Sequence, residues 1–342
     1  MVNARQYSLS LFTIHDAIIF CLCLTSLCSA LVVYDEASHV YERHWIRYLF
    51  AEHDFPNLSK LRDPPNCTIF VTRQNSSMYL HMANFSNSKT FIWLHLSDES
   101  QTSHSLFARE YSRWYVVFRN YWSVDTHDIY DRLEAQRKLA WFPLGYGHNF
   151  ATSYMPTRSP SHLLTFIGNT GNNPLRALHV QEIKGKGIDI YAATADSPFG
   201  NSIMNASVLT EVLLASDFCL NLPGASAECF RFYEALQCGC LPVIIDVFEG
   251  ADYSRRNWYE FKHLLSINRV KADGQWQSIF DAGHTQFPVP FFWINNANDL
   301  QVLNTLSVTD KLHLKLETYA WWGGVKDHFK GILHERIAAC TI

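Results

Sequence analysis

The stretch "SDFCLNLPGASAECFRFYEALQCGCLPVIID", residues 216–246, decides the fold of this sequence. An apolar segment ends in the Pro223-Gly224 turn, a segment with helical periodicity follows, and a second apolar segment starts directly after Gly239. Gly239 stands where a helix needs a left-handed residue at its end. The pattern predicts a strand, a turn, a helix and a second strand, as in a parallel sheet that is covered on both faces.

The predicted helix, residues 227–238, has an apolar and a polar side. A helical projection groups Phe232, Leu236, Cys229 and Tyr233 on one side and Arg231, Glu234 and Cys238 on the other. The apolar side must pack on the sheet. We therefore expect the polar side to face the crevice at the carboxyl ends of the strands, where such sheets bind their ligands.

Arg231 and Glu234 suit a nucleotide diphosphate. An arginine offers fork-shaped donors to phosphate oxygens, a carboxylate accepts the two hydrogen bonds of a ribose diol, and the N-terminus of a helix attracts anions. The alternative is an Arg-Glu pair at i,i+3 on a solvated helix face, which would have no function. The residues by themselves leave both readings open.

The same alternation of strands and helices extends along the chain and predicts an α/β protein. Strands are expected at 67–72, 91–97, 114–120, 140–145, 163–169, 187–193, 218–223 and 240–246, and helices at 128–138, 174–184, 207–215 and 227–238. The polar stretch 153–162 with two prolines reads as a linker between two doubly wound domains. From Val308 onward the sequence is mostly helical, and its end is expected to pack across the domains.

Composition and the N-terminus restrict the location and the partners. With 342 residues, 48% hydrophobic, the chain can bury two cores, and a net charge of −4 argues against nucleic-acid binding. Residues 17–33 form an uncharged apolar run at the lower length limit of a membrane span. We interpret it as an uncleaved signal anchor, with a cleaved signal peptide as the alternative. Both send the rest of the chain into the secretory lumen.

Sequons and cysteines agree with that compartment. Glycosylation acceptor triplets begin at Asn57, Asn66, Asn75, Asn84 and Asn205. Six cysteines follow the apolar run, and some should pair in an oxidising lumen. A zinc site is not supported, because Cys238 and Cys240 lack a second spaced pair.

The segment "FCLNLPGASAECFRFYEALQCGCLPVII" resembles the signature of the exostosin (GT47-like) family of glycosyltransferases, in its turn, its "FRF.EAL" helix and its "C.PV" strand. The resemblance implies a GT-B-like fold and a UDP-sugar donor. It carries nucleotide contacts onto Arg231 and Glu234 and a disulfide onto Cys219 and Cys240. The turn residues Gly224 and Ser226 belong to the same expected site.

Two further groups of residues are assigned less directly. The segment "LLTFIGNTGNNPLRALHV" resembles the family's loop that opens the donor domain, which implies that Gly168, Asn169 and Arg176 lie near the diphosphate; the alternative for Arg176 is an ordinary surface arginine. This chain departs from the family before "FCL", where it has no tyrosine in "SIMNASVLTEVLLASD". The pocket for the sugar is therefore less well defined.

The chemistry of transfer leaves the catalytic base open. The sequence contains no D-x-D pair, so neither a metal nor another cofactor is implied. The resemblance implies inversion, which needs a base for the acceptor hydroxyl. Candidates are His95, Asp98 and Glu99 at the end of a predicted strand, with a helix cap or a solvated loop as the alternative. Three side chains at further strand ends either line the acceptor cleft or have buried structural roles: Arg119, Asn120 and Tyr146.

Together these inferences predict a single-pass type II Golgi membrane protein with a lumenal catalytic part. It would transfer a sugar from a UDP-sugar to a glycan or glycoprotein, alone or as a homo- or heterodimer. The alternative is a catalytically silent lumenal protein that stabilises an active transferase. The expected organisation is a cytosolic tail at 1–16, an anchor at 17–33, an acceptor-side domain at 34–155, a nucleotide-sugar domain at 156–320 and a helix at 321–342.

Overall fold

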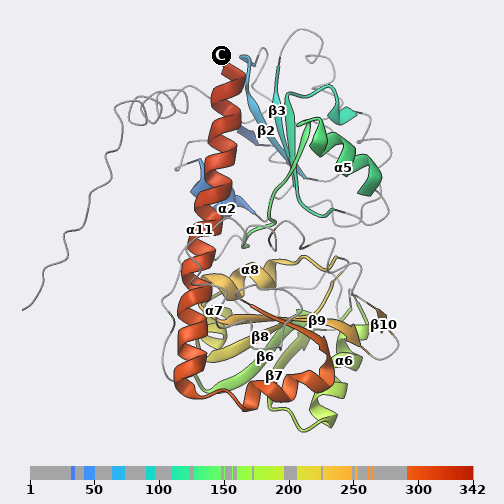
Figure 1. The fold of residues 1–342 in the computed structure, drawn as a ribbon, viewed down its shortest axis with the longest axis vertical. Helices are drawn as coiled ribbons and strands as arrows, with labels where there is room; N and C mark the ends of the chain where they lie inside the picture. The colour runs from blue at the N-terminus through green and yellow to red at the C-terminus, as the bar shows by residue number, and fades with distance from the viewer. Residues whose placement is uncertain are drawn as a thin grey trace, which may run out of the picture.

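The computed structural model contains two parallel β-sheets, one in each half of the chain (Figure 1). It describes residues 32–34, 42–50, 64–73, 90–96, 110–122, 127–147, 150, 156, 160–171, 173–195, 206–224, 226–248, 251–252, 261, 264 and 291–341. The predicted tail and most of the predicted anchor and linker lie outside these residues, as do Asp98 and Glu99. No helix within the described ranges is long and apolar enough to span a membrane.

The N-terminal sheet consists of short parallel strands in sequential order, β1-β2-β3-β4-β5. The strands are β1 (Val32–Tyr34), β2 (Ile69–Arg73), β3 (Ile92–Leu96), β4 (Val116–Arg119) and β5 (Leu139–Trp141), and the described helices between them are α2 (Arg43–Leu49) and α5 (His127–Ala135). Strands β3 and β4 are buried along their whole length. The four strands and the helix that the apolar pattern predicts in this half are therefore confirmed.

The predicted boundary of the membrane segment is wrong at its end. Val32 and Val33 were assigned to the anchor, but they belong to β1 and pair with Ile69 and Phe70. Both side chains are buried in the core. Two consecutive valines suit a strand as well as a membrane span, so hydropathy alone does not separate the two. Residues 17–31 stay a prediction.

The C-terminal sheet has the order β7-β6-β8-β9-β11, with the short β10 (Ala251–Asp252) antiparallel to β9. Its elements are β6 (His162–Asn169), α6 (Leu175–Gly185), β7 (Ile190–Ala195), α7 (Ala206–Leu214), β8 (Ser216–Asn221), α8 (Phe230–Gln237), β9 (Leu241–Phe248), β11 (Phe292–Asn296) and the 3₁₀ helix η4 (Ala297–Asn304). All predicted strands and helices of this half are present. Successive residues of β8 and β9 lie in two different apolar clusters, so the sheet is covered on both faces.

The two sheets differ in winding. In the C-terminal sheet the chain moves from β6 to β7 on one side and then to β8 on the other, so the direction reverses between β6 and β8. This is the doubly wound order. In the N-terminal sheet the described strands follow one another in sequential order without a reversal, which differs from the predicted doubly wound arrangement. Apolar periodicity indicates strands and parallel pairing but does not fix the order of strands in a sheet.

Helix α11 (Val308–Thr341), red in Figure 1, runs alongside both sheets. Its first half belongs to the C-terminal domain, where Lys311 and Lys315 contact Asp217 of β8 at 3.2 and 3.5 Å. Further along, the Phe329 ring packs on Trp141 of β5, with ring centroids 5.3 Å apart. The predicted packing of this helix across the domains is confirmed, although the helix starts at Val308 rather than at residue 321.

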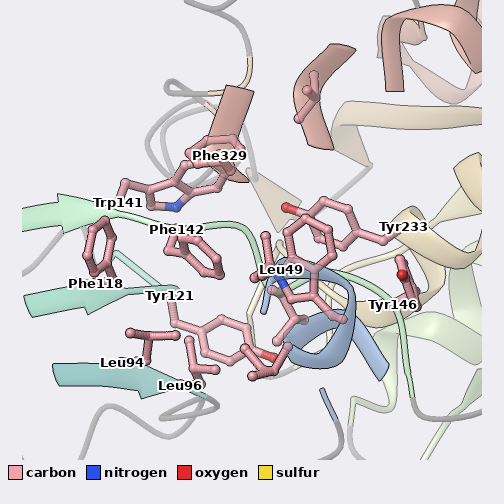
Figure 2. Packing of buried hydrophobic residues seen from close by; sticks show 14 of the residues in the cluster. Leu49, Leu94, Leu96, Phe118, Tyr121, Trp141, Phe142, Tyr146, Tyr233 and Phe329 are labelled. Carbon is pink, nitrogen blue, oxygen red and sulfur yellow. The ribbon is translucent and has the colours of Figure 1, made fainter. Parts of the chain in front are cut away.

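One apolar cluster joins the two halves. Trp322 of α11 packs on Trp45 of α2 and on Tyr233 of α8, with ring centroids 5.9 and 5.4 Å apart. Figure 2 shows part of this cluster, in which Tyr146 and Phe142 of the N-terminal half lie in the same packed region as Tyr233 and Phe329. Because the core is continuous, the two domains are held in one arrangement.

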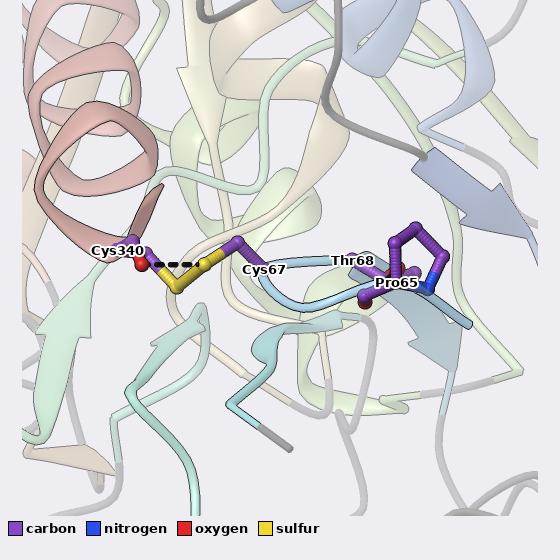
Figure 3. The surroundings of a disulfide bond; sticks show 4 residues. All are labelled: Pro65, Cys67, Thr68 and Cys340. Atoms are coloured by element: carbon purple, nitrogen blue, oxygen red, sulfur yellow. Dashed lines mark hydrogen bonds between the residues drawn. A yellow bond between two sulfur atoms is a disulfide. The ribbon is translucent and has the colours of Figure 1, made fainter. Parts of the chain in front are cut away.

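A disulfide between Cys67 and Cys340 ties the end of α11 to the start of β2 (Figure 3). The two Cα atoms are 5.7 Å apart, inside the usual bridging range. Cys219 and Cys240, which the family resemblance pairs, are free thiols in the structure and hydrogen-bond each other in the core. That pairing prediction is corrected accordingly. Burial raises the pKa of the Cys240 thiol well above its usual value.

Candidate functional site

The candidate site lies where the direction of the C-terminal sheet reverses, at the carboxyl ends of β6 and β8. Arg176 of α6 holds these two strand ends together: its guanidinium donates to the carbonyl oxygens of Asn169 (2.8 Å), Leu222 (2.9 Å) and Pro223 (3.0 Å). The side chain is 8% exposed. The structure thus places Arg176 beside the expected diphosphate region, but each guanidinium nitrogen already donates to the backbone. It is a clamp between strands rather than a surface arginine.

The two loops at this edge support each other. Asn173 Nδ2 donates to the carbonyl oxygens of Pro223 (3.0 Å) and Gly224 (3.3 Å), and Gly224 N donates to Ser226 O (2.8 Å). Asn169 Oδ1 accepts from Gly171 N (2.7 Å). The predicted site residues Gly168 and Asn169 therefore lie at the end of β6, and Gly224 and Ser226 lie in the loop after β8 that Arg176 joins to it. The Ser226 hydroxyl is buried and has no hydrogen-bond partner within the described part of the chain.

Helix α8 directs the Arg231–Glu234 pair toward this edge. The apolar residues Phe232, Tyr233 and Leu236 are buried, as the helical projection predicts. The helix ends as expected, because Gly239 has a φ of +64° and a side chain there would also meet Pro156. The Arg231 side chain is directed toward β6, and Glu234 lies beside it on the same helix.

Arg231 and Glu234 form an ion pair that is mostly shielded from water. Arg231 Nη1 contacts Glu234 Oε2, and Arg231 Nε donates to Ile167 O of β6 (3.0 Å). The Arg231 side chain is 22% exposed and that of Glu234 is 8% exposed. The alternative of a pair on a solvated helix face does not fit these values. Arg231 Nη2 makes no hydrogen bond to the residues that the structure describes.

The sequence analysis gives no role to Glu228. In the structure, its side chain forms hydrogen bonds across the boundary between the two domains. Its carboxylate is completely buried and accepts hydrogen bonds from Leu144 N (2.7 Å) and Tyr233 Oη (2.6 Å), with a longer contact from Tyr121 N (3.4 Å). A buried carboxylate needs such donors. Its position directly before the "CFRFYEAL" helix was the available signal, because two of its donors are backbone groups 84 and 107 residues away.

The N-terminal sheet carries a buried polar row instead of an open site. Thr72, His95 and Arg119 lie side by side in the register of β2, β3 and β4. His95 Nδ1 is 2.7 Å from Tyr111 Oη and 2.9 Å from Arg119 Nη1, and its ring stacks on Trp93. Both His95 and Arg119 are completely buried. His95 is therefore wrongly assigned as a base that reaches an acceptor hydroxyl.

The acceptor-cleft assignments also change. Asn120 and Tyr146 are buried, like Arg119, so the structure favours the structural alternative for all three. The Tyr146 ring packs against Trp45 with centroids 5.7 Å apart, and burial raises the pKa of its hydroxyl above the usual value. These side chains were expected in the cleft because they end strands, but the aromatic core covers this edge of the sheet. Asp98 and Glu99 remain predicted base candidates outside the described residues.

Cys229 precedes α8 between the two arginines. Its Sγ lies 2.8 Å from Asn221 Oδ1. Burial raises the pKa of the thiol to about 11, although Arg176 and Arg231 act in the opposite direction. The thiol is therefore protonated at neutral pH and donates a hydrogen bond rather than acting as a nucleophile.

Sequence comparison agrees with this geometry. The exostosin GT47 domain matches residues 74–261, more than half of the chain. The chain belongs to the exostosin GT47 family. Mouse ribitol-5-phosphate xylosyltransferase 1 is 24% identical over 176 residues, which cover 49% of this chain and 35% of the mouse protein. The match thus spans about a third of that relative, and it supports a glycosyltransferase family without fixing donor or acceptor.

Proposed function

We propose that the protein is a glycosyltransferase that transfers a sugar from a UDP-sugar to a glycan or glycoprotein. One observation carries the proposal: a shielded arginine–glutamate pair stands at the reversal point of a doubly wound sheet, inside the segment that matches the family. Ligands of such sheets bind at this point. The family match makes sugar transfer the reaction to test.

Arg231 and Glu234 have different roles in the proposal. The free side of the Arg231 guanidinium stabilises the charge that develops on the departing UDP, in a region where little water competes. Glu234 accepts hydrogen bonds from the ribose. Arg176 acts indirectly, because it fixes the loops that carry Gly168, Asn169 and Gly224 around the diphosphate.

The proposed transfer proceeds with inversion in a single displacement. The acceptor hydroxyl gives its proton to a base, its oxygen forms a bond to the anomeric carbon, and the bond from that carbon to the diphosphate oxygen breaks with UDP as the leaving group. Asp98 or Glu99 is the proposed base. We further propose that the charge of UDP is balanced by the protein without a metal ion, since the sequence has no D-x-D pair.

A lumenal Golgi location is part of the proposal. It is supported by the apolar run at 17–31, by the sequons and by the Cys67–Cys340 disulfide, which persists only where thiols oxidise. Asn66, one of the sequon asparagines, is exposed. Expression in secretory cells should give a membrane-bound, glycosidase-sensitive chain. Recovery of an unglycosylated chain from the cytosol would contradict this location.

A donor screen tests the proposed activity. The chain is incubated with a panel of UDP-sugars and UDP release is measured, with and without EDTA. UDP-xylose belongs in the panel because the mouse relative is named a xylosyltransferase. We expect UDP release from one donor, unchanged by EDTA and lost in Arg231→Ala. UDP binding without release from any donor would favour the silent-partner alternative, and the absence of UDP binding would refute the nucleotide site.

A further inference from the structure

We propose that the N-terminal domain forms one wall of the ribose subsite through residues 144–147, with Gly147 beside the Glu234 carboxylate and Glu228 as the residue that positions this segment. The inference rests on the proposed function, because it assigns the hydroxyl bound at Glu234 to a nucleotide. It adds residues from the other domain to a site that would otherwise consist of the C-terminal sheet alone.

Gly147 lies in direct contact with the carboxylate. A Cβ atom at this position would stand 2.8 Å from Glu234 Oε1 and 4.0 Å from Glu234 Cδ. A contact this short would force a side chain at position 147 or the Glu234 carboxylate to move. Only a glycine lets this segment approach the carboxylate without displacing it.

The two oxygens of Glu234 are used differently. Oε2 pairs with Arg231, whereas Oε1 faces Gly147 and has no hydrogen-bond partner among the residues that the structure describes. A carboxylate oxygen in a region with little water is costly unless a donor reaches it. A ribose hydroxyl is such a donor, and the close approach of Gly147 limits the positions that the Glu234 carboxylate can take when it accepts from this hydroxyl.

The segment around Gly147 is held from the C-terminal domain on both sides. Before it, Leu144 N donates to Glu228 Oε1 at 2.7 Å. After it, Phe150 O accepts from Gln237 Nε2 at 3.1 Å, and Phe150 N donates back to Gly147 O at 3.1 Å. Glu228 and Gln237 flank the helix that carries Arg231 and Glu234. The same helix therefore provides the ligand groups and fixes the wall opposite them.

The test measures which hydroxyls the site recognises. UDP, 2′-deoxy-UDP and 3′-deoxy-UDP are titrated against the full chain, Gly147→Ala, and Gly185→Ala as a matched control, because a Cβ at Gly185 meets nothing within 4 Å. We expect the parent and the control to prefer UDP over one deoxy analogue by roughly 10- to 100-fold, the value of a charged hydrogen bond. Gly147→Ala should reduce this preference to about 3-fold or less.

The ratio of the affinities for UDP and for a deoxy analogue separates loss of hydroxyl recognition from structural damage. A variant that merely disturbs the fold weakens all three nucleotides equally and keeps the ratio, which would overturn the inference. Equal binding of UDP and both deoxy analogues by the parent would also overturn it while leaving the proposed function intact. If the parent does not bind UDP at all, the proposed function fails and this inference fails with it.

Glu228 is tested as a positioning residue with two variants. Glu228→Gln keeps one acceptor oxygen for Leu144 N, whereas Glu228→Ala keeps none. We expect Glu228→Ala to lose the hydroxyl preference and Glu228→Gln to retain part of it. Parental preference in a folded Glu228→Ala variant would remove Glu228 from the proposal. If Glu228→Ala fails to fold, the inference is overturned when both Glu228→Gln and Gly147→Ala keep the parental hydroxyl preference.

Discussion

The described arginines near the two sheets differ in their surroundings, as Arg119 of β4 and Arg231 of α8 show. In the N-terminal sheet, His95 and Arg119 are completely buried against each other and against Tyr111. In the C-terminal domain, Arg231 of α8 keeps 22% of its side chain exposed beside Glu234. The strand order agrees with this difference. The chain reverses direction between β6 and β8, so the connections that follow these two strands diverge, whereas the described strands of the N-terminal sheet are in sequential order.

The comparison shows two different surroundings for an arginine that contacts the end of a parallel sheet. Arg119 donates to Tyr111 Oη at 2.8 Å and lies over the Tyr130 ring, so its charge is used inside the domain. Arg231 has one side engaged by Ile167 and Glu234 and the other side available. We infer that the first arginine stabilises the fold and the second binds ligand, and the following experiments can separate these roles.

The largest expected effect is on stability, at Arg119. Arg119→Ala removes a buried charge that contacts His95 and Tyr111 and leaves a cavity under Tyr130, so we expect the free energy of unfolding to fall by roughly 3–5 kcal/mol. Urea unfolding measures this change in the free energy of unfolding. Arg132→Ala on the exposed side of α5 is the control and should change stability by less than about 0.5 kcal/mol. Equal stability of both variants would contradict the structural role.

The disulfide has the next largest effect, because it joins the two regions that the comparison separates. Cys67→Ser with Cys340→Ser should lower the free energy of unfolding by about 2–4 kcal/mol, since the bridge closes a long loop. Peptide mapping without reductant should show Cys67 linked to Cys340. A linked Cys219–Cys240 pair in that map would instead support the family resemblance and contradict the structure. Cys238→Ser is a control that leaves the bridge intact.

The local sequence pattern predicted the strands and helices well, but it predicted less well how they assemble. The strands from β2 to β9, the end of α8 at Gly239 and the direction of Arg231 and Glu234 follow from periodicity within one segment. The bridge between Cys67 and Cys340 spans 273 residues and depends on the course of α11, which no local pattern contains. The same holds for Glu228, two of whose donors are backbone amides of the other domain.

The Arg231 variant sharpens the comparison by its effect on binding. Arg231→Ala should weaken UDP binding by about 1.5–3 kcal/mol, because a charged hydrogen bond to the diphosphate is lost. Glu234→Gln should cost less affinity than Glu234→Ala, since an amide oxygen still accepts from the ribose. UDP titration of the folded variants measures these differences in affinity. Parental affinity in both alanine variants would place the ligand elsewhere.

The smallest expected effect concerns Lys326 of α11, which lies where the two regions meet. Its Nζ donates to Gln237 Oε1 (3.1 Å) on the C-terminal side and stands over the Tyr48 ring on the N-terminal side. Burial lowers the pKa of its ammonium group to about 8, and Asp327 only partly offsets this. The folded chain thus binds fewer protons than the unfolded chain between about pH 8 and the ordinary lysine pKa near 10.4.

Stability should therefore rise with pH across that window, because the unfolded state takes up the proton that the folded state releases. Allowing for solvent screening, we expect the free energy of unfolding of the parent to gain about 1 kcal/mol over Lys326→Met between pH 7 and pH 10. Other groups titrate there too, including Tyr48, whose pKa is raised to about 12 by burial and by Asp327. The difference between parent and variant cancels their contribution. Lys184→Met on the exposed side of α6 should follow the parent, and parallel pH curves for the parent and Lys326→Met would show that Lys326 stays charged between the domains.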